Sequence, residues 1–494
     1  MDTDAGLDTF VIDDFGPSVR VQVPSTAEGL ARFNQAFLDP QKRAYVQHID
    51  FHIVLPTISY KRIKKIQSSK EAAENDAIFT RAIVIFLGRL AKWERRRYGP
   101  GISLKIAVES PTDRLVEEME EDGELRNTHN HRTAPIWQVR DHFRYLRFDH
   151  SLLPPSDSGL EKLPHVPCVS EFEFEGGPGG RNFHPDAISI ISSTLVSAKK
   201  MEWNFRLPTR RLMDARRCIR SALGNALLST SFPSLMELRI KVDDKDPMDE
   251  TYTIESLIGD HEEEDTLSLG VRRLCQLPTL RRLHLETLWI LSPVAFGSLE
   301  NQPDIHCPSL EYLYVDCSTT TPGGKYLLTG DQSKALADDG GYGLEHDEQV
   351  AVFDSDDSDT SDFQPDFEWS RQSGEFPGRW FRYTPEPETF APLVTSFVGA
   401  VDRMQSLRRM DIHFGGTATT TRAPLDMLYF APGEPNRGAS QLNGRKAFDE
   451  ENAGRPRWFF LGNRKFDKQW HLSKELQEAC KGESGLGRVH FATN

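Results

Sequence analysis

The feature that most constrains the fold of this chain is a short apolar motif that occurs twice. Residues 277–286 read Leu-Pro-Thr-Leu-Arg-Arg-Leu-His-Leu-Glu, and residues 308–315 read Pro-Ser-Leu-Glu-Tyr-Leu-Tyr-Val. Both match the L-x-x-L-x-L core of a leucine-rich-repeat strand, whose apolar positions point inward. The motif predicts that Leu280, Leu283 and Leu285 lie in the core of a sheet.

Comparable apolar segments begin at Val169, Ala198, Leu235 and Leu407, with helical patterns between them. Their spacing is uneven, whereas regular leucine-rich repeats recur about every 20–29 residues. A strand–helix unit buries its apolar face only by stacking on its neighbours, and parallel strands need long crossovers. The sequence therefore predicts an α/β fold, an irregular leucine-rich-repeat-like solenoid with a largely parallel sheet and outer helices.

Apolar periodicity also predicts the individual elements along the chain. Strands are expected at 45–55, 102–108, 169–174, 458–461 and 488–491, and helices at 72–97, 185–197, 212–228, 266–275, 389–403 and 472–480. Residues 1–24 are predicted to be a flexible tail, and residues 25–494 a single domain. An acidic insertion at 328–378 is expected to be disordered. A strand–helix–strand module at 456–494 is expected to close the sheet.

Composition narrows the class of protein. The chain has 494 residues and a formal net charge of −15, which argues against a broad nucleic-acid surface. No apolar run is long enough to span a membrane, and the six cysteines form no C-x-x-C pair. We therefore expect an intracellular protein without a metal or another cofactor.

Four motifs invite chemical interpretations that their context does not support. The glycine-rich run 176–181 lacks the Gly-Lys-Ser/Thr of a phosphate loop, and the acidic run 354–362 resembles a calcium loop but has Asp362 where glycine is required. His129 and His131 have no further ligands at metal spacing. The arginines at 210–220 suggest nucleic acid, but we interpret them as the solvated outside of a helix.

The predicted strands offer one candidate functional surface. Side chains between the inward apolar positions point to the opposite face of the sheet. Their mixture of charges with a tyrosine and two histidines suits protein recognition, although a merely solvated face fits equally well. The predicted partner-binding residues are Glu171, Glu173, Glu202, Arg239, Lys241, His284, Glu286, Tyr314, Asp316, Asp411 and His413.

Several short motifs, taken in order, resemble an uncharacterised family of filamentous-fungal proteins related to F-box proteins with irregular leucine-rich repeats. They are Arg43-Ala-Tyr-Val-Gln-His-Ile with Val54-Leu-Pro, Ala91-Lys-Trp with residues 102–113, Leu163-Pro-His-Val-Pro-Cys-Val-Ser, and the repeats at Pro278, Pro308 and Met404. The resemblance runs from about residue 40 to the C-terminus. It implies a repeat fold whose members usually begin with an F-box, which docks a Skp-type adaptor of a cullin–RING ubiquitin ligase.

The F-box pattern itself does not occur before Phe33, because no Leu-Pro-x-Glu-[Ile/Leu] opening is followed by a Trp-containing helix. We therefore expect either a start upstream of Met1 or a member that does not bind the adaptor.

The functional expectation is a non-enzymatic protein-interaction scaffold, in its finer version a substrate receptor of such a ligase. The alternative is an enzyme of an unrecognised class whose residues converge from separate repeats.

Overall fold

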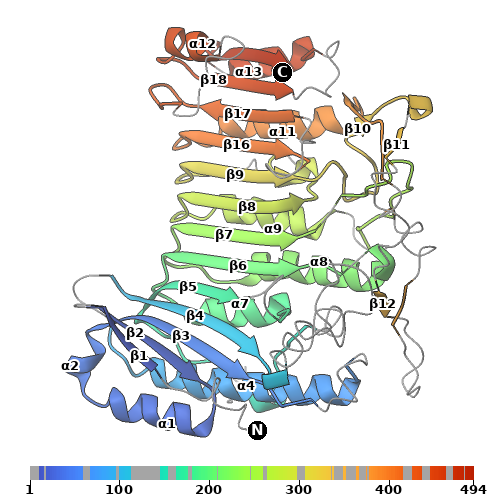
Figure 1. The fold of residues 1–494 in the computed structure, drawn as a ribbon. Coiled ribbons are helices and arrows are strands. Elements are labelled where there is room, and N and C mark those ends of the chain that lie inside the picture. Colours follow the sequence, from blue (N-terminus) through green and yellow to red (C-terminus); the bar gives the residue numbers. More distant parts are fainter. Residues whose placement is uncertain are drawn as a thin grey trace. The chain divides into compact units, whose positions relative to one another are not determined.

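The structure is a computed structural model, and its elements are shown in Figure 1. It describes residues 11–15, 18–58, 67–95, 100–112, 145–153, 163–175, 181–208, 210–244, 246–259, 264–297, 306–334, 336–338, 349–351, 363–365, 374, 378–415, 425–436, 445–462, 471–482 and 484–493. Contacts divide the chain into two compact units. Unit 1 contains residues 1–208, 230–235 and 340–369, and unit 2 contains residues 209–229, 236–339 and 370–494.

Unit 1 is an α/β structure built on the strand order β1-β2-β3-β4-β5-β6. The pair β1–β2 is antiparallel and the remaining pairs are parallel. The strands are β1 (Val11–Phe15), β2 (Ser18–Pro24), β3 (Val46–Val54), β4 (Ile102–Glu109), β5 (Val169–Glu175) and β6 (Lys200–Arg206), with the separate pair β12 (Gln349–Ala351) and β13 (Phe363–Pro365). The helices are α1 (Ala27–Ala36), α2 (Pro40–Arg43), α4 (Ser69–Leu90), the 3₁₀ turn η1 (His150–Leu152) and α7 (Pro185–Thr194).

The N-terminal segment differs from the predicted tail. Residues 11–15 and 18–24 form β1 and β2, and Val21 and Val23 are fully buried. The alternation of Val19, Val21 and Val23 is the period of a half-buried strand, but it is short and follows a polar start. Pairing with β3, which no local pattern reveals, gives this short stretch its place in the sheet.

Helix α4 is the longest helix of unit 1, and its sequence explains its start. Ser68 and Glu71 form a reciprocal capping box that satisfies two backbone N–H groups at the N-terminus. Its buried face includes Phe79 and Ile83, which are fully buried, whereas Ile85 is 45% exposed. The helix ends at Leu90, whereas the sequence predicted that it extends to residue 97.

Unit 2 is also an α/β structure, with the strand order β7-β8-β9-β16-β17-β18-β19. Strands β7, β8, β9 and β16 are parallel, β17 is antiparallel to both neighbours, and β18–β19 is parallel. These strands are β7 (Glu237–Asp243), β8 (Arg282–Trp289), β9 (Tyr312–Cys317), β16 (Arg409–Phe414), β17 (Leu425–Phe430), β18 (Arg457–Gly462) and β19 (Arg488–Thr493). The helices are η2 (Arg210–Leu212), α8 (Met213–Ser229), α9 (Thr266–Cys275), η3 (Pro293–Ala295), η4 (Gln332–Lys334), α11 (Phe390–Val401), α12 (Arg445–Glu451) and α13 (Lys474–Lys481).

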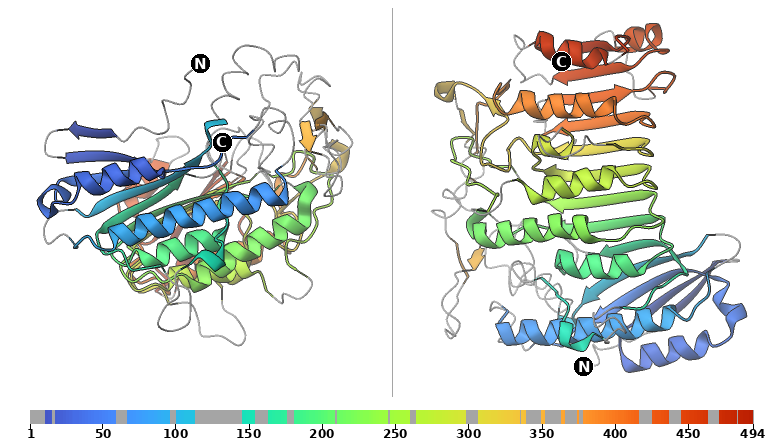
Figure 2. Two further views of the ribbon diagram at one scale, coloured as in Figure 1. Left: turned by 90° about the horizontal axis from the view of Figure 1, so that it is seen from below. Right: turned by 180° about the vertical axis from the view of Figure 1, so that it is seen from behind.

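The apolar residues of the motif at 277–286 lie in the core of the sheet, as predicted. Leu280, Leu283 and Leu285 are fully buried, and Leu283 pairs in register with Leu238 and Leu313 on either side. Helices α8, α9 and α11 lie behind these strands, as the reverse view shows (Figure 2). The predicted elements from 266–275 to 488–491 all occur, and β19 ends the strand order as expected.

The sequence did not predict two elements near the end of unit 2. Arg445–Glu451 forms α12, and Leu425–Phe430 forms the antiparallel strand β17. A leucine-rich-repeat pattern presupposes parallel strands, so it gives no signal for a strand that runs the other way.

The acidic insertion is described only in short pieces. Strands in or next to residues 328–378 form three short antiparallel pairs, and the run 354–362 with its calcium-loop pattern lies outside the described residues. These strands are β10 (Leu328–Thr329) with β15 (Thr384–Pro385), β11 (Leu336–Asp338) with β14 (Gly378–Trp380), and β12 with β13.

The arginine-rich helix α8 is not the solvated surface that we predicted. Arg216 and Arg220 are each only 2% exposed. Arg220 donates to Asp265 through Nε at 3.1 Å and Nη2 at 2.8 Å, and it also donates to the carbonyl of Ile290. Composition does not reveal such pairing, because the carboxylate comes from a distant part of the chain. Arg220 thus holds α8 against the start of α9 and the segment after β8, and Arg216 pairs with Asp244 after β7.

Helices α8 and α9 approach each other closely at glycines, which gives a first stability prediction. A Cβ at Gly224 would lie 2.6 Å from the backbone of Thr266, so α9 would have to shift. We expect Gly224→Ala to lower the free energy of unfolding by about 1–3 kcal/mol, which outweighs the roughly 1 kcal/mol that alanine gains over glycine in a helix.

Gly399 in α11 is the matched control, because a Cβ there would meet nothing closer than 4.0 Å. Gly399→Ala should raise the stability by about 0.4–1 kcal/mol. Chemical denaturation of both variants checks the pair. Equal effects would mean that the helices are not in close contact at Gly224.

Candidate protein-binding face

Unit 2 turns one face of its parallel strands away from helices α8, α9 and α11, toward the viewer in Figure 1. Side chains of four adjacent strands fall into register on this face: Arg239 with His284, His284 with Tyr314, and Tyr314 with Asp411. We call it the polar face. Its members are Arg239, Lys241, His284, Glu286, Tyr312, Tyr314, Asp316, Arg409, Asp411 and His413.

Two tyrosines anchor the centre of the polar face through buried carboxylates. The Tyr314 hydroxyl donates to Asp316 Oδ1 at 2.9 Å, and the Tyr312 hydroxyl donates to Asp411 Oδ2 at 3.0 Å. Arg409 forms a bidentate ion pair with Asp411, with Nε 2.9 Å from Oδ1 and Nη2 2.7 Å from Oδ2. Asp316 and Asp411 are only 2% and 3% exposed. The carboxylates are thus held below the surface, and the partly exposed rings remain above them.

The charges of this cluster shift its proton affinities. Burial raises the pKa of Asp316, with the hydrogen bond from Tyr314 acting against that shift. Burial and the adjacent carboxylates raise the pKa of both Tyr312 and Tyr314, so these hydroxyls stay protonated as donors. The tyrosines are therefore fixed in orientation at neutral pH.

The aromatic rings form a chain across three strands. The ring of His284 lies 5.2 Å from that of Tyr312 and 6.2 Å from that of Tyr314, and the rings of Tyr314 and His413 are 5.3 Å apart. Arg409 lies over Tyr312 with its guanidinium carbon 5.7 Å from the ring centroid. Rings in such contact stay in place and lose little freedom when a partner binds them.

Ion pairs border this aromatic chain. Arg239 Nε lies 3.1 Å from Glu286 Oε1, and Lys241 Nζ lies 4.0 Å from Glu286 Oε2. Both basic side chains are about a third exposed, so these pairs add little stability and remain available for exchange.

A backbone irregularity shapes the edge of the face at Thr287. This residue has a φ of 67°, a left-handed conformation that a β-branched side chain rarely adopts, and the register of β8 shifts there. Its N–H donates to Asp316 Oδ2 at 3.0 Å, and its hydroxyl bonds the backbone of Val242. The strained turn thus delivers an N–H to the buried carboxylate.

Beyond β16, the chain itself covers the same side of the strands. Phe448 of α12 packs at 5.4 Å from the ring of Phe459 and 5.1 Å from that of His490. Phe430 and Phe459 below it are fully buried. The apolar side chains of β17–β19 are therefore already covered by the chain's own helix.

The structure brings eight of the eleven predicted residues together on this face, and it places the other three in unit 1. Glu171, Glu173 and Glu202 lie on β5 and β6, where Glu173 and Glu202 are in register. Glu173 Oε1 also lies 3.7 Å from Lys105 Nζ of β4. Within unit 1, these glutamates point to the side of the sheet opposite the inward apolar positions, as we expected.

Sequence reasoning missed Tyr312, Arg409 and Asp426. The first two lie two residues before predicted positions on the same strands, so the alternation contained a usable signal. Asp426 belongs to β17, which the repeat pattern did not include. It contacts His413, with 2.8 Å between Oδ1 and Nδ1.

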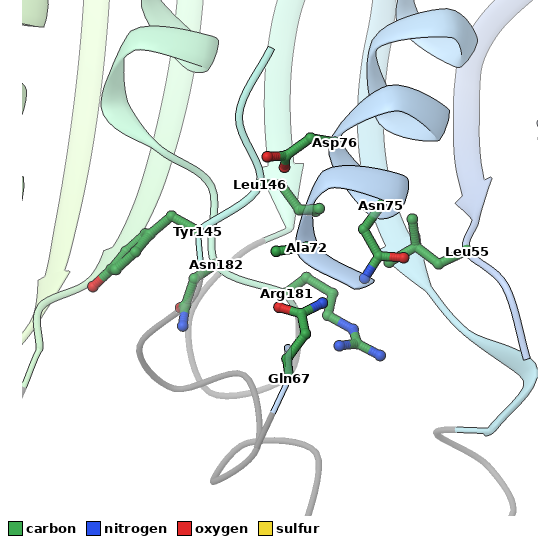
Figure 3. Close-up of a pocket in the computed structure, with 9 residues that line it drawn as sticks. All are labelled: Leu55, Gln67, Ala72, Asn75, Asp76, Tyr145, Leu146, Arg181 and Asn182. Carbon is green, nitrogen blue, oxygen red and sulfur yellow. The ribbon is translucent and has the colours of Figure 1, made fainter. Parts of the chain in front are cut away.

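A second candidate is a small pocket in unit 1, lined by both polar and apolar side chains (Figure 3). Its volume is ≈ 20 Å³, room for about one water molecule. Asn75 and Asp76 come from α4, and Arg181 and Asn182 from the segment before α7. Burial raises the pKa of Asp76, which accepts from the N–H of Arg147 at 2.8 Å. The pocket suits ordered water better than a substrate.

The remaining sequence motifs give no further site in the described part of the chain. The glycine run 176–180 and the histidines 129 and 131 lie outside the described residues. Across the residues that are described, no three His, Cys, Asp or Glu side chains gather as metal ligands. Among those same residues no helix has the length and apolar character needed to cross a membrane.

Comparison with known proteins does not identify a family for this chain. No protein family, curated protein or solved structure matches this chain.

The contact between His413 and Asp426 gives a pH prediction. Burial would lower the pKa of His413, but the hydrogen bond and charge of Asp426, with Asp316 and Asp411, raise it. A raised folded-state pKa means that the stabilisation is fully present below the unfolded value of about 6.5 and is lost as the pH rises through the folded value.

Urea unfolding of the protein and of Asp426→Asn at about pH 5.5 and pH 8.5 checks this prediction. The wild type should lose more stability across this range than the variant does. The difference should stay within about 1 kcal/mol, since the Asp426 side chain is 39% exposed and solvent screens the pair. The same pH dependence in both proteins would contradict a protonated His413 next to Asp426.

Proposed function

We propose that this chain is a non-enzymatic scaffold that binds another protein through the polar face of unit 2. The observation that carries the proposal is the chain of half-buried rings at His284, Tyr312 and Tyr314, held by buried carboxylates on rigid strands. Tyrosine and arginine dominate the energetics of protein interfaces, particularly where their orientation is fixed in advance.

The architecture supports this role. We interpret each unit as an irregular leucine-rich-repeat-like arrangement, since parallel strands connected by helical segments lie side by side in both. Repeat proteins of this kind use the extended surfaces of stacked strands to bind partners.

The resemblance to the F-box-related family gives a finer version, in which the chain serves as a substrate receptor of an SCF-type ubiquitin ligase. Affinity purification of the full-length protein from cells that express it tests this version. Recovery of a Skp-type adaptor at stoichiometric amounts would support it. Recovery of other partners without the adaptor would rule out the ligase role and leave the scaffold.

An enzyme of an unrecognised class is the second candidate, and one observation favours it. Asp316 lies on β9 with Tyr314, His413 comes from the neighbouring strand β16, and the pKa of both Asp316 and His413 is raised, as for groups of some catalytic sites. Turnover of any substrate in a hydrolase panel that is abolished by both Asp316→Asn and His413→Gln would replace the scaffold proposal. Turnover that survives both changes would not involve this cluster.

The scaffold proposal is tested by truncating its aromatic anchors. Tyr312→Ala with Tyr314→Ala should weaken the binding of recovered partners by at least about tenfold, the effect of losing 1.4 kcal/mol. Tyr45→Ala is the control, because Tyr45 is 59% exposed in unit 1 and lies outside the polar face. Equal recovery with all three proteins would contradict a binding role for the face.

A further inference from the structure

The edge of unit 2 where its parallel strands begin carries a set of arginines that the polar face does not account for. Arg281 and Arg408 immediately precede β8 and β16, Arg282 is the first residue of β8, and β9 lies between these strands. The side chains of Arg281 and Arg282 are 55% and 60% exposed, and Arg408 is exposed as well. We call Arg281, Arg282 and Arg408 the arginine edge.

The backbone places these arginines in equivalent positions. The N–H groups of Arg281 and Arg282 both donate to the carbonyl of Met236. Those of Arg408 and Arg409 donate in the same way to the carbonyl of Glu311, the residue before β9. The same turn at β9 places Glu311 and Tyr312, whose N–H groups donate to the carbonyl of Arg281, so arginines occupy these positions at β8 and β16 with an acidic residue between them.

Acidic residues at this edge neutralise the arginines only in part. Arg281 Nη1 lies 3.5 Å from Glu311 Oε1, and Arg282 Nη1 lies 3.7 Å from Glu237 Oε2. Exposed pairs of this kind contribute about 0–1 kcal/mol, so an incoming carboxylate displaces them readily. The local positive charge of the edge contrasts with the net charge of −15 of the whole chain.

The spacing of the edge indicates the kind of ligand. Neighbouring strands lie about 4.8 Å apart, so equivalent residues of β8 and β16 are about 9.6 Å apart. A polyproline II peptide rises about 3.1 Å per residue and repeats every three residues, so its same-side residues are about 9.3 Å apart. Guanidinium groups bind carboxylates and phosphates through paired hydrogen bonds.

We infer that the arginine edge binds an acidic segment of a partner protein in an extended conformation, with an acidic residue at every third position. The excess negative charge of the chain repels a nucleic acid, whose phosphates form a continuous polyanion. A short acidic peptide contacts only the basic edge. The distance of about 9.3 Å between its acidic residues matches the distance of about 9.6 Å between equivalent residues of β8 and β16.

The experiment measures fluorescence anisotropy with the full-length protein and a fluorescein-labelled peptide of four Asp-Pro-Pro triplets. Binding should be saturable, should weaken as salt increases, and should exceed that of a peptide of the same composition with its four aspartates in a row. Arg281→Glu with Arg408→Glu should raise the Kd at least about tenfold.

The matched control is Lys446→Glu with Lys481→Glu, which changes the net charge equally at side chains that are 50% and 44% exposed in the same unit. It should leave the Kd within about twofold of the wild type. Circular dichroism confirms that the variants fold.

Three results would overturn the inference. They are no binding, equal loss in the control variant, and tighter binding of a single-stranded oligonucleotide with the same arginine dependence. The arginine edge is a separate site from the aromatic anchors. A negative result at the arginine edge would therefore not contradict the proposed function, which the tyrosine variants test.

Discussion

Asp265→Ala is expected to lower the free energy of unfolding by about 3–5 kcal/mol, the largest effect of any single change discussed for this chain. Asp265 is 3% exposed and accepts both hydrogen bonds from the buried guanidinium of Arg220. It also caps α9 by accepting from the N–H of Ser268 at 3.1 Å. Its removal leaves a buried charge without its counter-charge and a helix without its cap. Guanidinium denaturation followed by circular dichroism measures the loss.

Two further variants separate these causes. Asp214→Ala removes a fully exposed partner of Arg217 on the same helix, and its effect should stay within about 0.5 kcal/mol. Replacing the buried pair together, as Arg220→Met with Asp265→Leu, should cost less than Asp265→Ala alone, since no charge remains buried. Both variants lack the helix cap, so a double variant that is no more stable than Asp265→Ala would contradict charge burial as the main cause of the loss.

Leu283→Ala is expected to lower the free energy of unfolding by about 2–5 kcal/mol. The side chain is fully buried between Leu238 and Leu313 in the middle of the parallel strands, so the cavity cannot collapse without moving its neighbours. Leu486→Ala is the comparison, because Leu486 is 52% exposed and should matter by less than about 0.5 kcal/mol. A small effect at Leu283 would contradict the register of β8.

The sequence predicted well what depends on local apolar patterns. The L-x-x-L-x-L motif identified β8 and β9, and helix 266–275 agrees with α9 at both ends. Strand alternation also identified the side of the sheet on which eight face residues meet. These features follow from neighbouring residues, so a single sequence contains them.

What the sequence did not predict depends on contacts between distant segments. The burial of Arg220 requires Asp265, and the contact of His413 with Asp426 requires the antiparallel strand β17. Strands β1 and β2 join the sheet because β2 pairs with β3. Helix α12 is positioned by the aromatic side chains that it covers. No local period encodes such partners. The arrangement of the chain in two compact units is of the same kind.

The central claim is that the polar face of unit 2 contacts a protein partner. Site-specific photo-crosslinking tests it most directly, with benzoylphenylalanine placed at Tyr314 on the face and, in a parallel sample, at Tyr45 in unit 1. After irradiation of cells that express the full-length protein, we expect a discrete crosslinked species from position 314 that position 45 does not give. Crosslinks from position 45 alone, or the same species from both positions, would contradict the claim.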